Sequence, residues 1–175
     1  MVKLKKTMKK IGKIFLCFLL VVALVNILAP LFCRKPDEKY AENLRQTEFT
    51  SETAGTERIH CIDDNEEALL WRLRMIGTAK ESIVLSTFDL RADENGTKLL
   101  AALNHAADKG VKIQLLIDGI YQQLFLSGNS DFQALAAHEN VEVGVYNPVT
   151  PANLFKLNYR MHDKYVIIDE KMYLL

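Results

Sequence analysis

The chain has 175 residues, of which 49% are hydrophobic and 25% charged, with 22 Lys and Arg against 22 Asp and Glu. This composition fits one domain with a packed core, provided that the apolar residues are not concentrated in a membrane segment. Six lysines and no acidic residue lie within residues 1–33, which leaves 16 basic against 22 acidic residues beyond them. The part after residue 33 therefore carries an excess of negative charge, which disfavours diffuse binding to nucleic acid.

The N-terminal region contains an apolar run from Ile14 to Cys33 that follows the six lysines. The run is close to the ~20 residues that a helix needs to cross a bilayer, and basic residues stay on the cytoplasmic side. We expect residues 1–33 to be a basic N-terminus and transmembrane anchor, residues 34–57 a polar tether, and residues 58–175 the folded domain. The predicted location is the cell membrane, single-pass, with the N-terminus cytoplasmic and the domain extracytoplasmic. A cleavable signal peptide is the alternative.

The cysteines predict no disulfide within the domain. Cys17 and Cys33 lie in or at the edge of the apolar run, so Cys61 is the only thiol of the soluble part. Ile59–Ile62 is a short candidate strand, and Cys61 is expected to be a small core residue beside Ile59.

The first part of the domain has the pattern of a parallel α/β unit. Acidic and Asx residues from Asp63 predict a helix that continues to about Thr78. A strand, a helix and a second strand are then expected, and a crossover helix between strands implies parallel pairing. Their predicted ranges are Ser82–Phe88, Thr97–Lys109 with Gly110 as its left-handed end, and Val111–Ile117, with Asp89–Gly96 as a polar loop.

The second part is less regular. A helix is expected at Asp131–His138 and strands at Val141–Tyr146, Lys164–Ile168 and Met172–Leu175, the last two joined by a turn at Asp169-Glu170-Lys171. Tyr121–Asn129 reads as a loop or irregular helix. Asp118, at the end of a predicted strand, is a candidate for either a turn cap or a ligand-binding carboxylate.

His162 and Lys164 carry the strongest chemical signal. In an extended chain, residues two apart point to the same face. An imidazole can attack phosphorus or move a proton near neutral pH, while the ammonium group can hold phosphate oxygens. The structural alternatives are a histidine bonded to a backbone carbonyl and a solvated lysine.

The spacing His162-x-Lys164-x-x-x-x-Asp169 resembles the signature of the phospholipase D superfamily, and the flanking Asn158 and Arg160 resemble it too. The helix, glycine turn and strand from Lys98 to Asp118 are similar to those of the cardiolipin-synthase-like branch. The resemblance extends from about Ile59 to Leu175.

This resemblance implies a phospholipase D-like α/β sandwich with a mixed, mostly parallel sheet, of which the chain holds one half after its transmembrane helix. It implies His162, Lys164 and Asp169 as catalytic residues, Arg160 and Asn158 as substrate-binding residues, and no cofactor or metal. Two His-x-Lys motifs then meet at one phosphate, where one histidine forms a phosphohistidine and the other protonates the leaving alcohol.

The position of Asp169 favours a structural role despite its place in the motif. It follows Lys164 by five strand residues, roughly 16 Å at about 3.3 Å per residue, and cannot easily reach His162. We expect it to close the turn at Glu170-Lys171 or to accept a hydrogen bond from a nearby backbone donor.

The predicted function is a membrane-anchored phosphodiesterase or phosphatidyltransferase that acts on a phospholipid. Because the sequence stops inside an apolar strand, we expect it to be the first half of a longer enzyme or a truncated form, with a second motif supplied by the same longer chain or by a homodimer partner. The alternatives are a single-motif phosphodiesterase or nuclease active as a homodimer, and a non-catalytic remnant. Nucleic acid is not an expected partner, and His60, His105 and His138 share no metal-ligand spacing.

Overall fold

The computed structural model describes residues 2–32, 37–46, 55–56 and 58–175. The chain has two compact units, Met1–Ile62 and Asp63–Leu175. The described residues of the first unit form α1 (Val2–Leu28), the 3-10 helix η1 (Ala29–Phe32) and α2 (Glu38–Gln46). Helix α2 lies within the segment expected to be a tether, whose residues 34–36, 47–54 and 57 lie outside the described residues.

Helix α1 contains a candidate membrane span at Lys6–Leu28, 23 residues long, in which an 18-residue window reaches a mean hydropathy of 2.6. Its length and composition suffice to cross a bilayer. A signal sequence near the N-terminus has the same properties, so the helix fits either a membrane anchor or a signal sequence.

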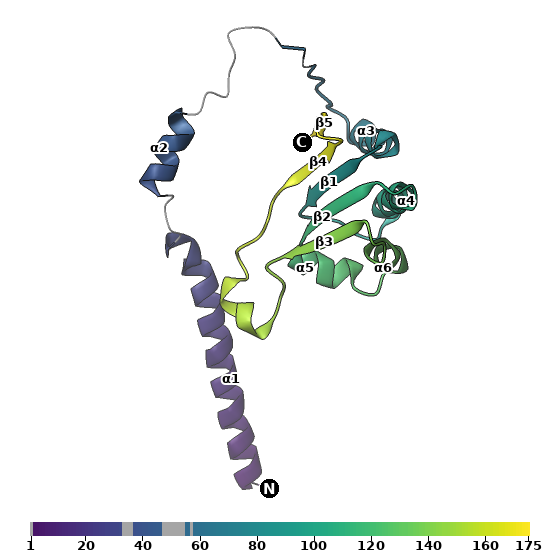
Figure 1. Ribbon diagram of the computed structural model, residues 1–175. Coiled ribbons are helices and arrows are strands. Elements are labelled where there is room, and N and C mark those ends of the chain that lie inside the picture. The colour runs from purple at the N-terminus through teal and green to yellow at the C-terminus, as the bar shows by residue number, and fades with distance from the viewer. Residues whose placement is uncertain (1, 33–36, 47–54, 57) are drawn as a thin grey trace. The chain divides into compact units, whose positions relative to one another are not determined.

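The second unit is built on a five-stranded sheet with the order β3-β2-β1-β4-β5 (Figure 1). The strands are β1 (Ser82–Thr87), β2 (Lys112–Asp118), β3 (Val141–Tyr146), β4 (Lys164–Ile168) and β5 (Met172–Leu174). Strand β1 pairs parallel with β2, and β2 parallel with β3, whereas β4 is antiparallel to both β1 and β5. The sheet is mixed, as expected, but it divides evenly between the two kinds of pairing.

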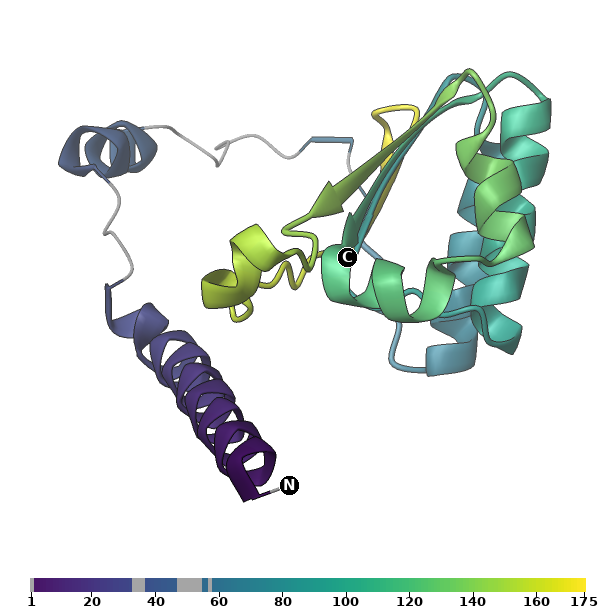
Figure 2. The ribbon, with the colours of Figure 1, turned by 90° about the horizontal axis from the view of Figure 1, so that it is seen from below.

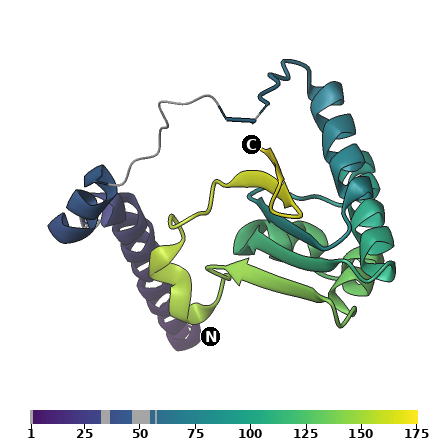
Figure 3. The ribbon, with the colours of Figure 1, turned by 45° about the horizontal axis from the view of Figure 1, so that its top comes forward.

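Three helices, α3 (Asn65–Thr78), α4 (Glu94–Asp108) and α6 (Ser130–Ala136), cover one face of this sheet (Figures 1 and 2). The crossovers β1-α4-β2 and β2-α6-β3 advance in the same direction, and crossovers of one hand then place both helices on the same face. The core between helices and sheet contains Ile76, Ile83, Leu85, Leu100, Leu103, Ile113, Leu115, Ile117, Leu135, Val166 and Ile168. Residues 63–175 thus form an α/β unit of two layers, the helices and the sheet (Figure 3).

Side-chain caps set the helix boundaries. Asp64 accepts a hydrogen bond from the Glu67 N–H (2.9 Å) and begins α3, as predicted. Asp93 caps α4 through the Gly96 N–H (2.9 Å), so this helix begins before the expected Thr97. Gly110 adopts φ +83° after α4, which confirms its predicted left-handed conformation.

The predicted strand at Ile59–Ile62 is wrong. These residues form no strand, Ile59 is 93% exposed, and Cys61 is exposed rather than part of the core. A short apolar segment becomes a strand only where a neighbour satisfies its backbone groups, and no strand of the described sheet pairs with it.

The region after β2 is irregular, as expected. A single helical turn, α5 (Gly119–Tyr121), continues into the π-helix η2 (Gln122–Leu126), and a 3-10 helix, η3 (Pro151–Lys156), follows β3. Gly119 is needed at the start of α5, because a Cβ there would lie 2.6 Å from the Cα of Pro148. The segments after β2 and β3 therefore lie against each other at the carboxyl ends of the parallel strands.

Candidate active site

A buried carboxylate fixes the chain just before His162. Asp118, at the end of β2, is fully buried, and it accepts hydrogen bonds from Arg160 Nη1 (3.0 Å), the Met161 N–H (3.2 Å) and the Ile120 N–H (3.0 Å). Arg160 Nη2 also donates to the carbonyl oxygen of Asn147 (3.0 Å). Asp118 therefore caps α5 and also ties the segment that leads into β4 to the end of β2.

His162 lies at the surface and rests on an aromatic side chain. Its ring stacks on Phe88, with 4.4 Å between ring centroids and 15° between planes. Lys164 Nζ is 5.9 Å from the centroid of the same Phe88 ring and donates to the carbonyl oxygen of His162 (3.1 Å). The imidazole and the ammonium group are thus both exposed and lie around one ring, as their two-residue spacing predicts.

Phe88 belongs to a line of aromatic residues that sequence reasoning missed. Its ring is 4.5 Å from that of Tyr121, which is 5.5 Å from that of Phe125. Arg91 covers this line, with its guanidinium carbon 4.9 Å from the Phe125 ring, and binds Asp89 through two hydrogen bonds of 2.7 and 2.8 Å. The hydrogen bond to Asp89 raises the pKa of the Arg91 guanidinium.

Asp163 holds the other side of the motif to β1. Its carbonyl oxygen accepts the Phe88 N–H (3.0 Å), and its carboxylate lies 3.4 Å from the hydroxyl of buried Ser86. These contacts continue the pairing of β1 with β4 by one residue beyond Thr87 and Lys164. The only signal in the sequence for this pairing of β1 with β4 was that the predicted strand Ser82–Phe88 is apolar at its centre.

Asp169 lies at the far end of β4 from Lys164. Its carboxylate accepts hydrogen bonds from the N–H groups of Ser82 (2.9 Å), Glu81 (2.8 Å) and Lys80 (3.0 Å). These donors hold the pKa of the Asp169 carboxyl below its ordinary value. The expectation that Asp169 binds backbone donors is confirmed, and no contact brings it to His162.

The two predicted substrate-binding residues differ in their surroundings. The Arg160 side chain is only 11% exposed and its guanidinium is bound to Asp118, so the structure gives it a role in positioning the motif. Asn158 is exposed in the turn before it. Direct contact of either residue with substrate stays a prediction.

The other histidines of the C-terminal unit, His105 and His138, lie away from this cluster. His60 precedes α3, His105 lies in the last turn of α4, and His138 follows α6, where its Nε2 is 3.8 Å from Asp108. Among the described residues, no group of three or more His, Cys, Asp or Glu side chains could hold a metal ion.

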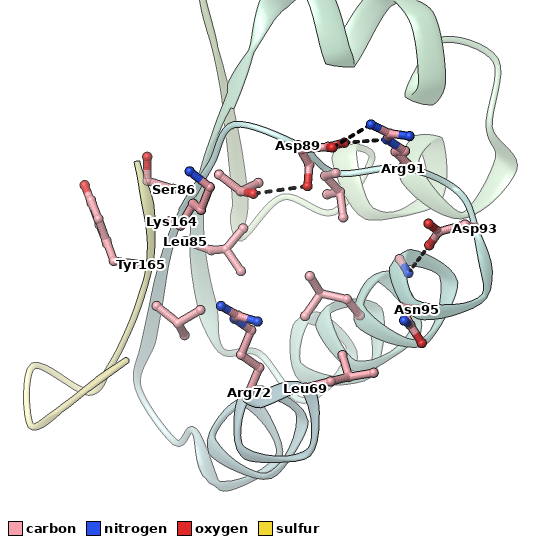
Figure 4. Close-up of a pocket in the computed structure, with 15 residues that line it drawn as sticks. Leu69, Arg72, Leu85, Ser86, Asp89, Arg91, Asp93, Asn95, Lys164 and Tyr165 are labelled. Carbon is pink, nitrogen blue, oxygen red and sulfur yellow. Dashed lines mark hydrogen bonds and ion pairs between the residues drawn. The ribbon is translucent and has the colours of Figure 1, made fainter. Parts of the chain in front are cut away.

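A cavity of about 380 Å³ opens on the helix-covered side of Lys164. It lies between the ends of β1 and β4 and the helices α3 and α4, and the Arg72 side chain points into it from α3 (Figure 4). Arg72 was absent from the residues that the sequence suggested, because nothing local marks it.

Comparisons with known proteins agree on one family. Residues 73–175 match the family described as the phospholipase D-like domain of cardiolipin synthase. Cardiolipin synthase B of Salmonella typhi is 37% identical over 124 residues, 66% of this chain, and that of Escherichia coli K12 is 32% identical over the same length. An uncharacterised protein of Helicobacter pylori is 28% identical over 141 residues. The chain spans about a quarter of the length of these relatives (26–28%).

Two solved structures are also similar to this chain. Nuc of Salmonella typhimurium, a phospholipase D family member, has a TM-score of 0.40 and 22% identity, with 57% of this chain and 56% of Nuc covered. NucT of Helicobacter pylori has a TM-score of 0.44 and 21% identity, with 62% of this chain and 64% of NucT covered.

Proposed function

The chain belongs to the phospholipase D superfamily, in its family of cardiolipin-synthase-like domains, and from this premise we propose that His162 and Lys164 act on the phosphodiester of a phospholipid. The observation that carries the proposal is the exposed imidazole stacked on Phe88 with the Lys164 ammonium beside the same ring. The stacked ring has a fixed orientation, and Lys164 places positive charge where phosphate oxygens would gain charge during the reaction.

The reaction that fits these groups has two steps. An imidazole attacks phosphorus, so that a P–N bond forms, the P–O bond to the leaving alcohol breaks, and a second imidazole protonates that alcohol. The second imidazole then removes the proton of an incoming hydroxyl, a new P–O bond forms, and the P–N bond breaks. With water as acceptor the result is hydrolysis, and with a glycerol hydroxyl it is phosphatidyl transfer.

The second imidazole in this scheme comes from another His-x-Lys segment. The other histidines of the C-terminal unit, His105 and His138, lie at the end of α4 and after α6, away from the candidate site. The relatives are about four times as long as the matched part, which favours a second motif in the rest of a longer chain. A second copy of this chain is the alternative source.

A phospholipid substrate is supported by helix α1. If Lys6–Leu28 is an anchor, the domain stays within a short tether of the bilayer, which raises its effective concentration at the lipid headgroups. Residues after 33 carry more acidic than basic side chains, which weighs against the runner-up function, a nuclease that works as a homodimer.

The test is covalent labelling of His162. The full chain, reconstituted in vesicles with phosphatidylglycerol labelled in its phosphate, is expected to form an acid-labile phosphohistidine that is lost in His162→Ala. His138→Ala is the matched control and should label like the wild type. An unlabelled wild-type chain would exclude a second copy of this chain as the source of the second imidazole, and equal labelling of wild type and His162→Ala would contradict the proposed site.

A further inference from the structure

The cavity beside Lys164 has the size of a ligand site and a mixed lining. Its volume of about 380 Å³ lies within the ~300–1,000 Å³ typical of small-molecule pockets. Leu85 and Val166 from the sheet and Leu69 and Leu99 from the helices form apolar walls. Lys164 lines this cavity and also lies beside the Phe88 ring on which His162 stacks, so the cavity and the candidate active site share this residue.

The charges around the cavity do not cancel. Asp89 is bound on both oxygens by Arg91, at 2.7 and 2.8 Å. Asp93 accepts the Gly96 N–H as the cap of α4 and lies across the cavity from Lys164 (Figure 4). Lys164 and Arg72 are two further cations of the lining, and they lie on the side of the cavity away from Asp93 (Figure 4).

Arg72 is a lining residue that has no counter-ion among the described residues. It is half-buried on α3, and its guanidinium group points into the cavity (Figure 4). In the part of the chain that the structure describes, no hydrogen bond or ion pair of Arg72 is found. A guanidinium group offers five donors in a planar fork that matches phosphate or carboxylate oxygens. Partial removal from water without a partner is unfavourable, and an anion in the cavity would relieve it.

We propose that this cavity is a second anion site, in which Arg72 binds a phosphate group that is not cleaved while His162 and Lys164 hold the reacting phosphate. The inference rests on the proposed function for the identity of the reacting group. The apolar walls would contact the carbon atoms that join the two phosphates. Such a site selects acceptors or substrates that carry an additional phosphate over neutral alcohols, because a neutral hydroxyl cannot replace a charge-assisted bond.

The test measures phosphate binding at the cavity directly. The full chain in detergent micelles, labelled at Leu and Val methyl groups, is titrated with inorganic phosphate and followed by NMR. Methyl groups of Leu69, Leu99 and Val166 are expected to shift in the wild type. Arg72→Gln should weaken the binding seen at these methyl groups at least tenfold, with the core methyl groups of Leu103 unchanged as a control for folding.

Arg74→Gln is the matched control, because Arg74 lies on the same helix but is exposed over the Trp71 ring, with 5.9 Å to its centroid. It should bind phosphate like the wild type. Equal affinities of wild type and Arg72→Gln, or an equal loss in Arg74→Gln, would overturn the inference. Repeating the titration with vesicles of phosphatidylglycerol and with glycerol phosphate distinguishes a lipid headgroup from a soluble phosphate ester, and a response to either supports the site.

The outcome is independent of catalysis by His162. In His162→Ala the cavity methyl groups should still respond to phosphate, even though labelling is lost. If labelling of the wild type fails while the Arg72-dependent shifts occur, catalysis by copies of this chain alone is refuted and the anion site stands. If labelling occurs and Arg72→Gln binds phosphate normally, the reverse holds.

Discussion

The buried ion pair between Asp118 and Arg160 should be the most sensitive point of the domain. Asp118 is fully buried and the Arg160 side chain is 11% exposed, so water can replace neither partner. Removing one member of a buried pair leaves a charge without compensation and typically costs ~3–5 kcal/mol. The same pair holds the backbone next to His162, so its loss should disturb the candidate site as well as the fold.

The two single substitutions should differ in magnitude. Arg160→Met leaves the Asp118 carboxylate with two backbone donors, from Ile120 and Met161, so we expect the lower end of that range, about 3 kcal/mol. Asp118→Ala removes three hydrogen bonds and leaves the guanidinium group, whose Nε is already without a partner, bound only to Asn147. We expect about 5 kcal/mol for it, a large part of the ~5–15 kcal/mol stability of a typical domain. The double variant should be more stable than Asp118→Ala alone, because it leaves no buried charge.

Urea unfolding of the full chain in detergent micelles measures these effects. Trp71, on α3, is the only tryptophan, so its fluorescence reports the C-terminal unit alone. Lys98→Met is the control, because the Lys98–Glu94 pair is exposed and should contribute less than ~1 kcal/mol. An Arg160→Met midpoint equal to that of Lys98→Met would refute the reasoning, as would a double variant less stable than Asp118→Ala.

Three further predictions concern stability, with urea midpoints as the measurement. Because the pKa of Asp169 is lowered, its stabilisation of the fold is complete above the ordinary carboxyl pKa of ~3.9 and is lost as the pH falls through the folded-state pKa. The wild type should therefore lose more stability than Asp169→Asn below about pH 4. Parallel curves of stability against pH for the two proteins would contradict this. Glu170 has φ +55°, so Glu170→Gly should gain roughly 0.5 kcal/mol, and a loss would argue against strain in this turn. Gly119→Ala should lower the free energy of unfolding by about 1–3 kcal/mol, since the new Cβ would meet the backbone of Pro148. Gly77→Ala, in open space on α3, should raise it by ~0.5–1 kcal/mol. Equal effects of the two substitutions would show that the close contact at Gly119 can relax without cost.

Local patterns in the sequence predicted most of the elements of the C-terminal unit. Asx caps, the glycine after α4 and apolar strands are signals carried by a few neighbouring residues, and they placed β1, β2, β3 and β4 within one residue of their observed ends. The prediction of a strand at Ile59–Ile62 failed because a short apolar segment forms a strand only beside a partner strand. The start of α4 was placed too late, because Asp93 was read as part of a loop.

The residues of the candidate site also differ in whether the local sequence could predict them. His162 and Lys164 could be predicted, because two residues at i and i+2 of an extended segment share a side whatever the rest of the fold. The contact between Arg160 and Asp118 joins residues 42 apart in sequence, and the place of Phe88 depends on which strand lies next to β1. Such relations are set by the sheet order, and a single sequence does not encode them locally.

The direction of one strand decides which end of the motif can do chemistry. In parallel α/β sheets ligands bind at the carboxyl ends of the strands. Because β4 runs antiparallel to β1, its first residue, Lys164, pairs with Thr87 at that end, and Ile168 pairs with Ile83 at the other. A parallel β4 would carry Asp169 to the ligand edge and His162 away from it.

The position of Asp169 at the end of β4 far from His162 has a physical reason. A slip of one residue between β4 and β1 would turn every side chain of β4 to the opposite face and move Lys164 away from the Phe88 ring. The three N–H groups at residues 80–82 that bind the Asp169 carboxylate are fixed to the start of β1, and a slipped strand would lose them. The carboxylate at one end of β4 therefore holds the register that places the imidazole and the ammonium group at the other.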